Sequence, residues 1–142
     1  MATFSDIQQA YFKLTINDKQ LLGIFLSRSG SINRSGNAEL DGTDTRMFMG
    51  RLDGDPVAAL FADVDEKLLE LTGRYTLPDQ KGDACQLTIS LGGENLDTGF
   101  EFNYGSESEG PPEEIYQLVD VALDLTEEWY QHQLDTHRKN KR

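Results

Sequence analysis

The sequence has only one cysteine, Cys85, and two histidines in 142 residues. A lone cysteine cannot form an internal disulfide, and this usage is typical of a reducing compartment. The start of the chain, Met1 to Asp6, has neither the basic nor the apolar region of a signal peptide. No apolar run approaches the roughly 18 residues that a membrane-spanning helix needs. We therefore expect a cytoplasmic protein.

Basic residues are also scarce, since 13 Lys and Arg face 25 Asp and Glu, for a formal net charge of −12. Affinity for phosphates comes from Lys and Arg that displace counterions, so this balance argues against a nucleic-acid partner. It argues equally against docking on an anionic membrane. The 37% of hydrophobic residues fall in periodic patches and indicate a folded chain. We expect a single domain over residues 1–137 and a basic C-terminal tail over 138–142.

Short apolar or alternating segments predict strands in two parts of the chain. These segments are 12–16, 21–26, 31–34, 47–49, 75–77, 85–91 and 100–104. Ser29-Gly30 predicts the tight turn of a first hairpin, and residues 35–45 read as a loop. The second hairpin, over 85–104, has one apolar and one polar face. That pattern is typical of an antiparallel sheet covered on one side.

A first helix is predicted directly after Asp55. Asp55 is a favourable N-cap, and Pro56 suits the first helical position. Apolar residues from Val57 to Leu71 then recur at helical spacing on one side. Gly73 predicts the C-terminal stop of a single helix.

A last helix is predicted after Pro111-Pro112, with an apolar side that runs from Ile115 to Trp129. The acids at its start and the basic residues after its end both favour the helix macrodipole. We therefore expect an α+β fold. It should consist of a mostly antiparallel sheet of about six to seven strands with two amphipathic helices packed on one face.

The negative charge is concentrated in one segment. Residues 82–137 contain no Lys or Arg and 13 of the 25 acidic residues, so the rest of the chain is nearly balanced. On the last helix, five acids fall within an arc of about 100° opposite the apolar side. They are Glu113, Asp120, Asp124, Glu127 and Glu128. Like charges at i,i+4 repel, and a cationic partner would relieve that repulsion and be steered to this face.

Four further residues complete the predicted partner-binding set. Glu107 and Glu109 precede the last helix, Val121 falls off its apolar side, and Tyr116 lies on the margin. Apolar groups beside an acidic face suit an interface hot spot. Two plainer interpretations stay open. The acids can serve solubility alone, and the apolar side chains can pack on a neighbouring loop or a second subunit.

Patterns for catalysis or metal binding are missing from the sequence. His132 and His137 lack the i,i+4 spacing of a helical zinc pair, and no cysteine pair completes a site. Cys85 lies on the apolar side of its strand and reads as a buried thiol. The Asp-Gly segments at 41–44 and 53–55 do not continue into a calcium-loop pattern. We predict no metal, no cofactor and no enzymatic activity.

These observations favour a protein-binding inhibitor, namely a bacterial toxin-immunity protein that occludes a basic enzyme cleft with an acidic face. Its partner would be a basic protein, such as a toxin or effector domain, bound by a monomer or a homodimer. The alternative is a small acidic secretion chaperone or adaptor, dimeric and with an exposed apolar groove. A third class is an enzyme assembled from scattered residues, which a deep pocket with strongly shifted pKa values would favour.

Overall fold

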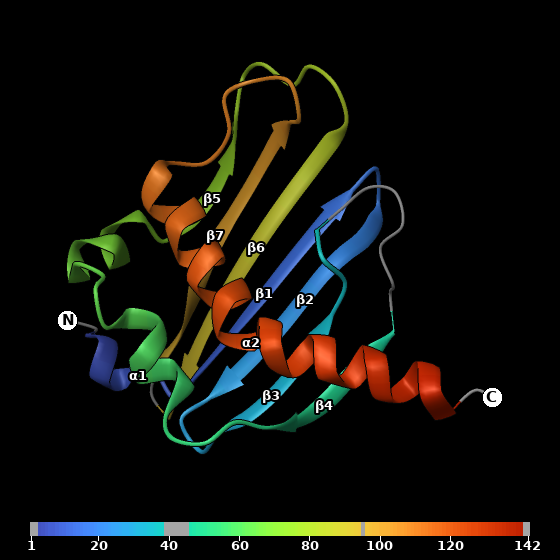
Figure 1. The fold of residues 1–142 in the computed structure, drawn as a ribbon. Helices are drawn as coiled ribbons and strands as arrows, with labels where there is room; N and C mark the ends of the chain where they lie inside the picture. Colours follow the sequence, from blue (N-terminus) through green and yellow to red (C-terminus); the bar gives the residue numbers. More distant parts are fainter. Residues whose placement is uncertain (1–2, 39–45, 95, 141–142) are drawn as a thin grey trace.

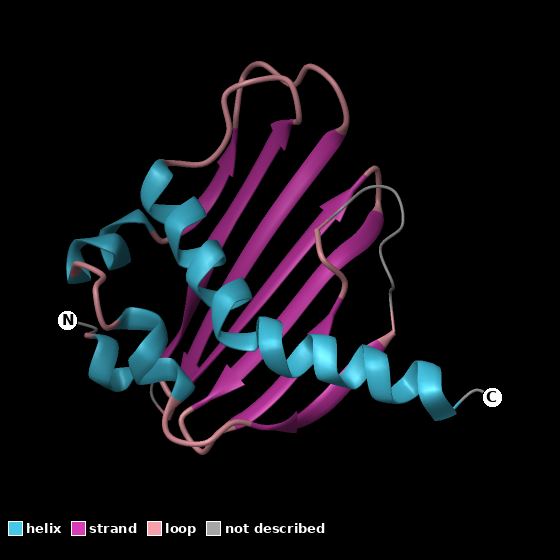
Figure 2. Ribbon diagram, in the orientation of Figure 1, coloured by secondary structure: helices cyan, strands magenta, loops and turns pink. Residues whose placement is uncertain are grey.

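The computed structural model of this chain shows a seven-stranded sheet with two α-helices on one face (Figure 1; Figure 2). The structure describes residues 3–38, 46–94 and 96–140. The strands are β1 (Gln9–Ile16), β2 (Lys19–Ser27), β3 (Ser31–Ser35), β4 (Met47–Arg51), β5 (Gly73–Thr76), β6 (Ala84–Gly93) and β7 (Leu96–Gly105). The helices are the 3-10 helix η1 (Phe4–Asp6), α1 (Pro56–Phe61), the 3-10 helix η2 (Glu66–Leu71) and α2 (Glu113–Asn140). The expected α+β class is confirmed.

The strand order explains where the helices lie. It runs β4-β3-β2-β1-β6-β7-β5, and within the described residues only the β5–β7 pair is parallel. Because β4 and β5 follow each other in sequence but lie at opposite edges, the segment between them must cross the whole sheet. This crossing segment carries α1 and η2, and it runs on the same side of the sheet as α2 (Figure 1).

The core lies between the sheet and these helices. Phe12, Ile24, Ile89 and Phe100 are paired across β1, β2, β6 and β7 and form one buried row. Apolar side chains of α1 and α2 belong to the same buried cluster. Full burial of each such side chain contributes about 1.5–3 kcal/mol, which makes this contact the main force that holds the helices on the sheet.

The predicted hairpin turn after β2 is confirmed. Gly30 has a φ of +98°, a conformation that side chains rarely adopt, and a Cβ there would lie 2.5 Å from the Leu52 carbonyl oxygen. The Leu52 amide donates to the Gly30 carbonyl at 2.7 Å. Glycine at this turn therefore lets the chain beyond β4 pass close to the hairpin.

The prediction of a single first helix is wrong. The Asp55 carboxylate does accept the Ala58 amide at 2.9 Å and caps α1, but α1 ends at Phe61. The Val64 amide then bonds to Phe61, and the Asp65 carboxylate accepts the Lys67 amide and caps η2. Aspartate side chains favour helix caps over helix interiors, so Asp65 starts a second helix where the apolar pattern predicted a continuation of the first. The apolar spacing persists because both helices face the sheet.

The predicted last helix is confirmed. α2 begins at Glu113, directly after Pro112, and continues past His137 to Asn140. It crosses the sheet from the side of β7 toward β4 (Figure 1). The predicted boundary between domain and tail, at 137/138, therefore falls inside this helix, and the tail itself stays a prediction. The Asp-Gly segment at 41–44 lies outside the described residues.

Candidate functional site

Arg34 of β3 fixes the orientation of α2. Its side chain is 1% exposed, and its guanidinium donates to the Glu127 carboxylate at 2.8 Å and the Thr126 hydroxyl at 3.1 Å. It also donates to Asn37 at 2.9 Å and lies 4.3 Å from the centre of the Tyr130 ring. These contacts hold one side of the helix against the sheet, so the opposite side faces outward.

The outward side of α2 carries the predicted carboxylates. Glu113, Asp120, Asp124 and Glu128 are all exposed, and we call these four residues the acidic face. Among the described residues, no basic side chain forms an ion pair with Asp120, Asp124 or Glu128. Asp120, Asp124 and Glu128 follow at i,i+4, so their mutual repulsion is not relieved within the described chain.

Glu127, the remaining predicted acid of the helix, lies apart from this face because it pairs with Arg34. Burial alone would raise the pKa of Glu127, but hydrogen bonds from Gln131 and Arg34 and the charge of Arg34 lower it. Its side chain stays 48% exposed. Glu127 therefore anchors the helix, and part of its charge is already neutralised.

Some carboxylates of residues 82–137 do not lie on the outward side of α2. Glu101 alternates with the buried Phe100 and Phe102, so it points to the other face of the sheet, where it pairs with Arg74 at 2.9 Å. Glu107 and Glu109 are exposed in the loop between β7 and α2, and the Glu107 amide donates to the Lys81 carbonyl. The negative charge of residues 82–137 is therefore less concentrated on one side of the molecule than the sequence predicts.

Tyr116 packs on a neighbouring loop. Its hydroxyl lies so close to Gly110 that a Cβ there would clash with it, and burial raises the pKa of this phenol. The residue is 42% exposed, which leaves one side of the ring open to solvent. The plainer interpretation of Tyr116, a contact with a loop, therefore describes its position.

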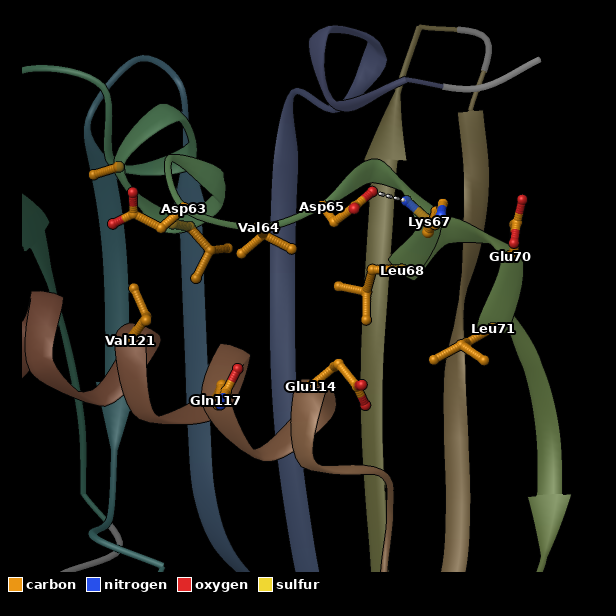
Figure 3. A pocket seen from close by; sticks show the side chains of 12 residues that line it. Asp63, Val64, Asp65, Lys67, Leu68, Glu70, Leu71, Glu114, Gln117 and Val121 are labelled. Carbon is orange, nitrogen blue, oxygen red and sulfur yellow. Dashed lines mark hydrogen bonds between the residues drawn. The ribbon is translucent and has the colours of Figure 1, made fainter.

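Val121 opens into a groove of about 750 Å³ between α2 and the α1–η2 segment. The groove is lined by Ala59, Leu60, Asp63, Val64, Asp65, Lys67, Leu68, Glu70, Leu71, Glu114, Gln117 and Val121. In Figure 3 the side chain of Val121 points from α2 toward the opposite wall, and Gln117 and Glu114 follow it along the same helix. We call this feature the groove.

The groove brings together acids from two distant parts of the sequence. Asp63, Asp65 and Glu70 lie along the α1–η2 wall, and Glu114 lies on the α2 wall. Sequence reasoning missed the first three because the part of the chain before residue 82 is nearly neutral in sum. The position of Val121, off the apolar side of its helix, was the signal that pointed to this place.

The described residues contain no group of three or more His, Cys, Asp or Glu side chains placed to hold a metal ion. Cys85 is buried as predicted, and burial raises the pKa of its thiol, which disfavours the reactive thiolate. Within the same residues, no helix has the length and apolar character to cross a membrane.

Comparison with protein-family models, with curated proteins and with solved structures finds no match to this chain. The possible binding partners of the surface are therefore inferred from its chemistry. A helix ridge with unrelieved negative charge, beside a groove with apolar walls, can bind a cationic surface and an apolar group at the same time.

Proposed function

We propose that this chain is a protein-binding inhibitor that uses the acidic face to occlude a basic cleft of another protein, in the manner of a bacterial toxin-immunity protein. The observation that carries the proposal is the row Asp120, Asp124 and Glu128, exposed on the outer side of α2 and without ion pairs among the described residues. Helix α2 lies over the sheet as a raised ridge, a shape that fits a concave surface (Figure 2). The single buried cysteine supports a place in the cytoplasm.

The proposal predicts electrostatic effects on binding that can be measured. Each i,i+4 repulsion on the ridge is worth a few tenths of a kcal/mol, roughly 0.2–0.5, and a bound cation removes it. Steering by complementary charge raises association rates from about 10⁵–10⁶ to as much as about 10⁸–10⁹ M⁻¹s⁻¹ at low salt. The acidic face should therefore act mainly on the association rate, and the effect should fall as salt is added.

Capture from extracts of the source cells tests the proposal. The variant Asp120→Asn/Asp124→Asn/Glu128→Gln removes three charges from the ridge, and a matched control, Asp18→Asn/Asp79→Asn/Asp97→Asn, removes three exposed charges elsewhere. We expect the wild type and the control to retain a basic protein that the ridge variant loses. Addition of the chain should then inhibit the activity of that protein. Equal capture by both variants, or capture without inhibition, would contradict the proposal.

A secretion chaperone or adaptor is the second candidate, and the groove favours it. Chaperones of this kind are expected to be dimers with an apolar groove. A second copy would find apolar surface at the edge strand β4, where Met47 is 48% and Met49 74% exposed. Sedimentation of the wild type and of Met49→Lys separates the candidates. A dimer that the substitution dissociates supports the chaperone, and a monomer supports the inhibitor.

A further inference from the structure

We infer that the groove binds a basic, amphipathic helical segment of the partner protein, with its apolar side chains between the walls and its Lys or Arg side chains at the rim. This inference rests on the proposed function in one respect, since it takes the partner to be a basic protein. It adds which part of that partner docks, and where.

The groove has the size and lining of a binding site. Its volume of about 750 Å³ lies within the range of about 300–1,000 Å³ that is usual for ligand pockets. Leu60 and Leu68 are almost fully buried at its base, and Val64, Leu71 and Val121 are half-buried around them. These half-buried side chains can lose further apolar surface on binding, at about 25 cal/mol for each Å² removed from water.

The backbone of the walls favours a helix as the occupant. One wall is α2 and the other is α1, the link over residues 62–65 and η2; none of these is a strand, so an extended segment would find no strand to pair with. A bound helix satisfies its own backbone and needs only an apolar side to insert. It would lie beside α2 as a further member of the layer over the sheet.

The charged residues at the rim determine which charge the bound segment should carry. Asp63, Asp65, Glu70 and Glu114 face one base, Lys67, among the described residues that line the groove. The Asp65 carboxylate caps η2 but stays exposed, as do the other three acids. An acidic or neutral helix would add repulsion or leave these acids unrelieved, whereas Lys and Arg beside its apolar side would meet them. Lys67 would oppose such a segment.

A synthetic peptide tests the inference on the full chain. The probe is a labelled helix of about 18 residues, or five turns, with Leu at i, i+3, i+4 and i+7 and Lys at most other positions. A control peptide has the same composition in scrambled order, so its charge is equal but its apolar side is lost. Fluorescence anisotropy should show binding of the probe at least about tenfold tighter than of the scrambled peptide. Equal binding of both peptides would overturn the inference.

Variants then locate the bound peptide. Val121→Ser should weaken binding about three- to tenfold through lost apolar contact, and Glu70→Gln should weaken it by up to about threefold. Lys67→Gln should tighten it by a similar factor. The matched control for Glu70→Gln is Asp97→Asn, an exposed acid on β7, which should change little. Amide chemical shifts should change at residues 59–71 and 114–121.

The result also separates this inference from the proposed function. If the ridge variant abolishes peptide binding while Val121→Ser and Lys67→Gln leave it unchanged, the basic ligand sits on the acidic face alone. The groove inference then fails and the proposed function stands. If the groove binds the peptide as described but the extract yields no partner that the chain inhibits, the proposed function fails and the groove remains a peptide site.

Discussion

Replacing Arg34 by alanine should remove the contact that fixes α2 on the sheet. The guanidinium lies in the interior and reaches the Leu123 carbonyl at 3.3 Å and the Gly36 carbonyl at 3.3 Å, besides its ion pair with Glu127. Alanine removes these donors together with the flat surface that packs on the Tyr130 ring. The Gly36 carbonyl would then need water or a new partner, whereas the Leu123 carbonyl keeps its hydrogen bond from the Thr126 hydroxyl.

The expected loss of stability follows from how well each partner can recover. Loss of one member of a fully buried ion pair costs about 3–5 kcal/mol, because a charge stays buried without a partner. Here the Glu127 side chain is 48% exposed and can turn to solvent, so that part of the loss is small. The unsatisfied Gly36 carbonyl and the lost packing remain, and we expect a loss of about 2–4 kcal/mol for Arg34→Ala. Arg34→Lys, which keeps the charge but not the planar fork, should lose about 1–2 kcal/mol.

Equilibrium unfolding in urea, followed by circular dichroism, measures these differences. The comparison variant is Glu127→Gln, which keeps an acceptor for the guanidinium but leaves its buried charge without a counter-ion, so it should cost about 1–2 kcal/mol, less than Arg34→Ala. A larger loss for Arg34→Ala than for Arg34→Lys or Glu127→Gln is the central expectation. A loss below about 1 kcal/mol for Arg34→Ala, or an equal loss for Glu127→Gln, would refute the assignment of Arg34 as the anchor of α2.

Three further outcomes are expected. Because Arg34 and its other partners lower the folded pKa of Glu127, the pair stabilises the fold above the unfolded pKa of about 4.3 and loses this effect as the pH falls through the folded pKa. The stability difference between wild type and Glu127→Gln, measured in urea, should therefore vanish in strong acid. Cys85 should react with a thiol reagent only at the rate of unfolding, and fast labelling of the native protein would contradict its burial. A Cβ at Gly50 would lie 2.7 Å from the Trp129 ring, so Gly50→Ala should shift the tryptophan emission, and an unchanged spectrum would contradict this contact.

The sheet and α2 could be predicted because their sequence periods are long and uninterrupted. Alternation along residues 85–91 and 100–104 places one side in the core, and the structure pairs these strands as β6 and β7. The first helix could not be predicted in full, because apolar spacing alone does not reveal a break. There the local hydrogen bonds of Asp65 decide the backbone, and they prevail over the helical period.

The acidic face was predictable for a similar reason, since helix geometry alone sets which residues share a side. The groove was not, because its walls meet only after the chain has crossed from β4 to β5 (Figure 1). Asp63 and Glu114 are 51 positions apart in the sequence and line the same groove. No local pattern relates them, and only the topology of the sheet brings them together.

The same topology gives the molecule two electrically different sides. Lys13, Arg51 and Arg74 alternate with residues of the helix-covered side and therefore point to the other face of the sheet, where Arg74 pairs with Glu101. The acidic face and the groove lie on the helix-covered side, so carboxylates without ion pairs among the described residues gather beside α2. A cationic protein that approaches from a distance is drawn to that side before any contact forms. Once there, it meets the ridge and the groove next to each other, and the charge that guides the approach is the charge that the bound state relieves.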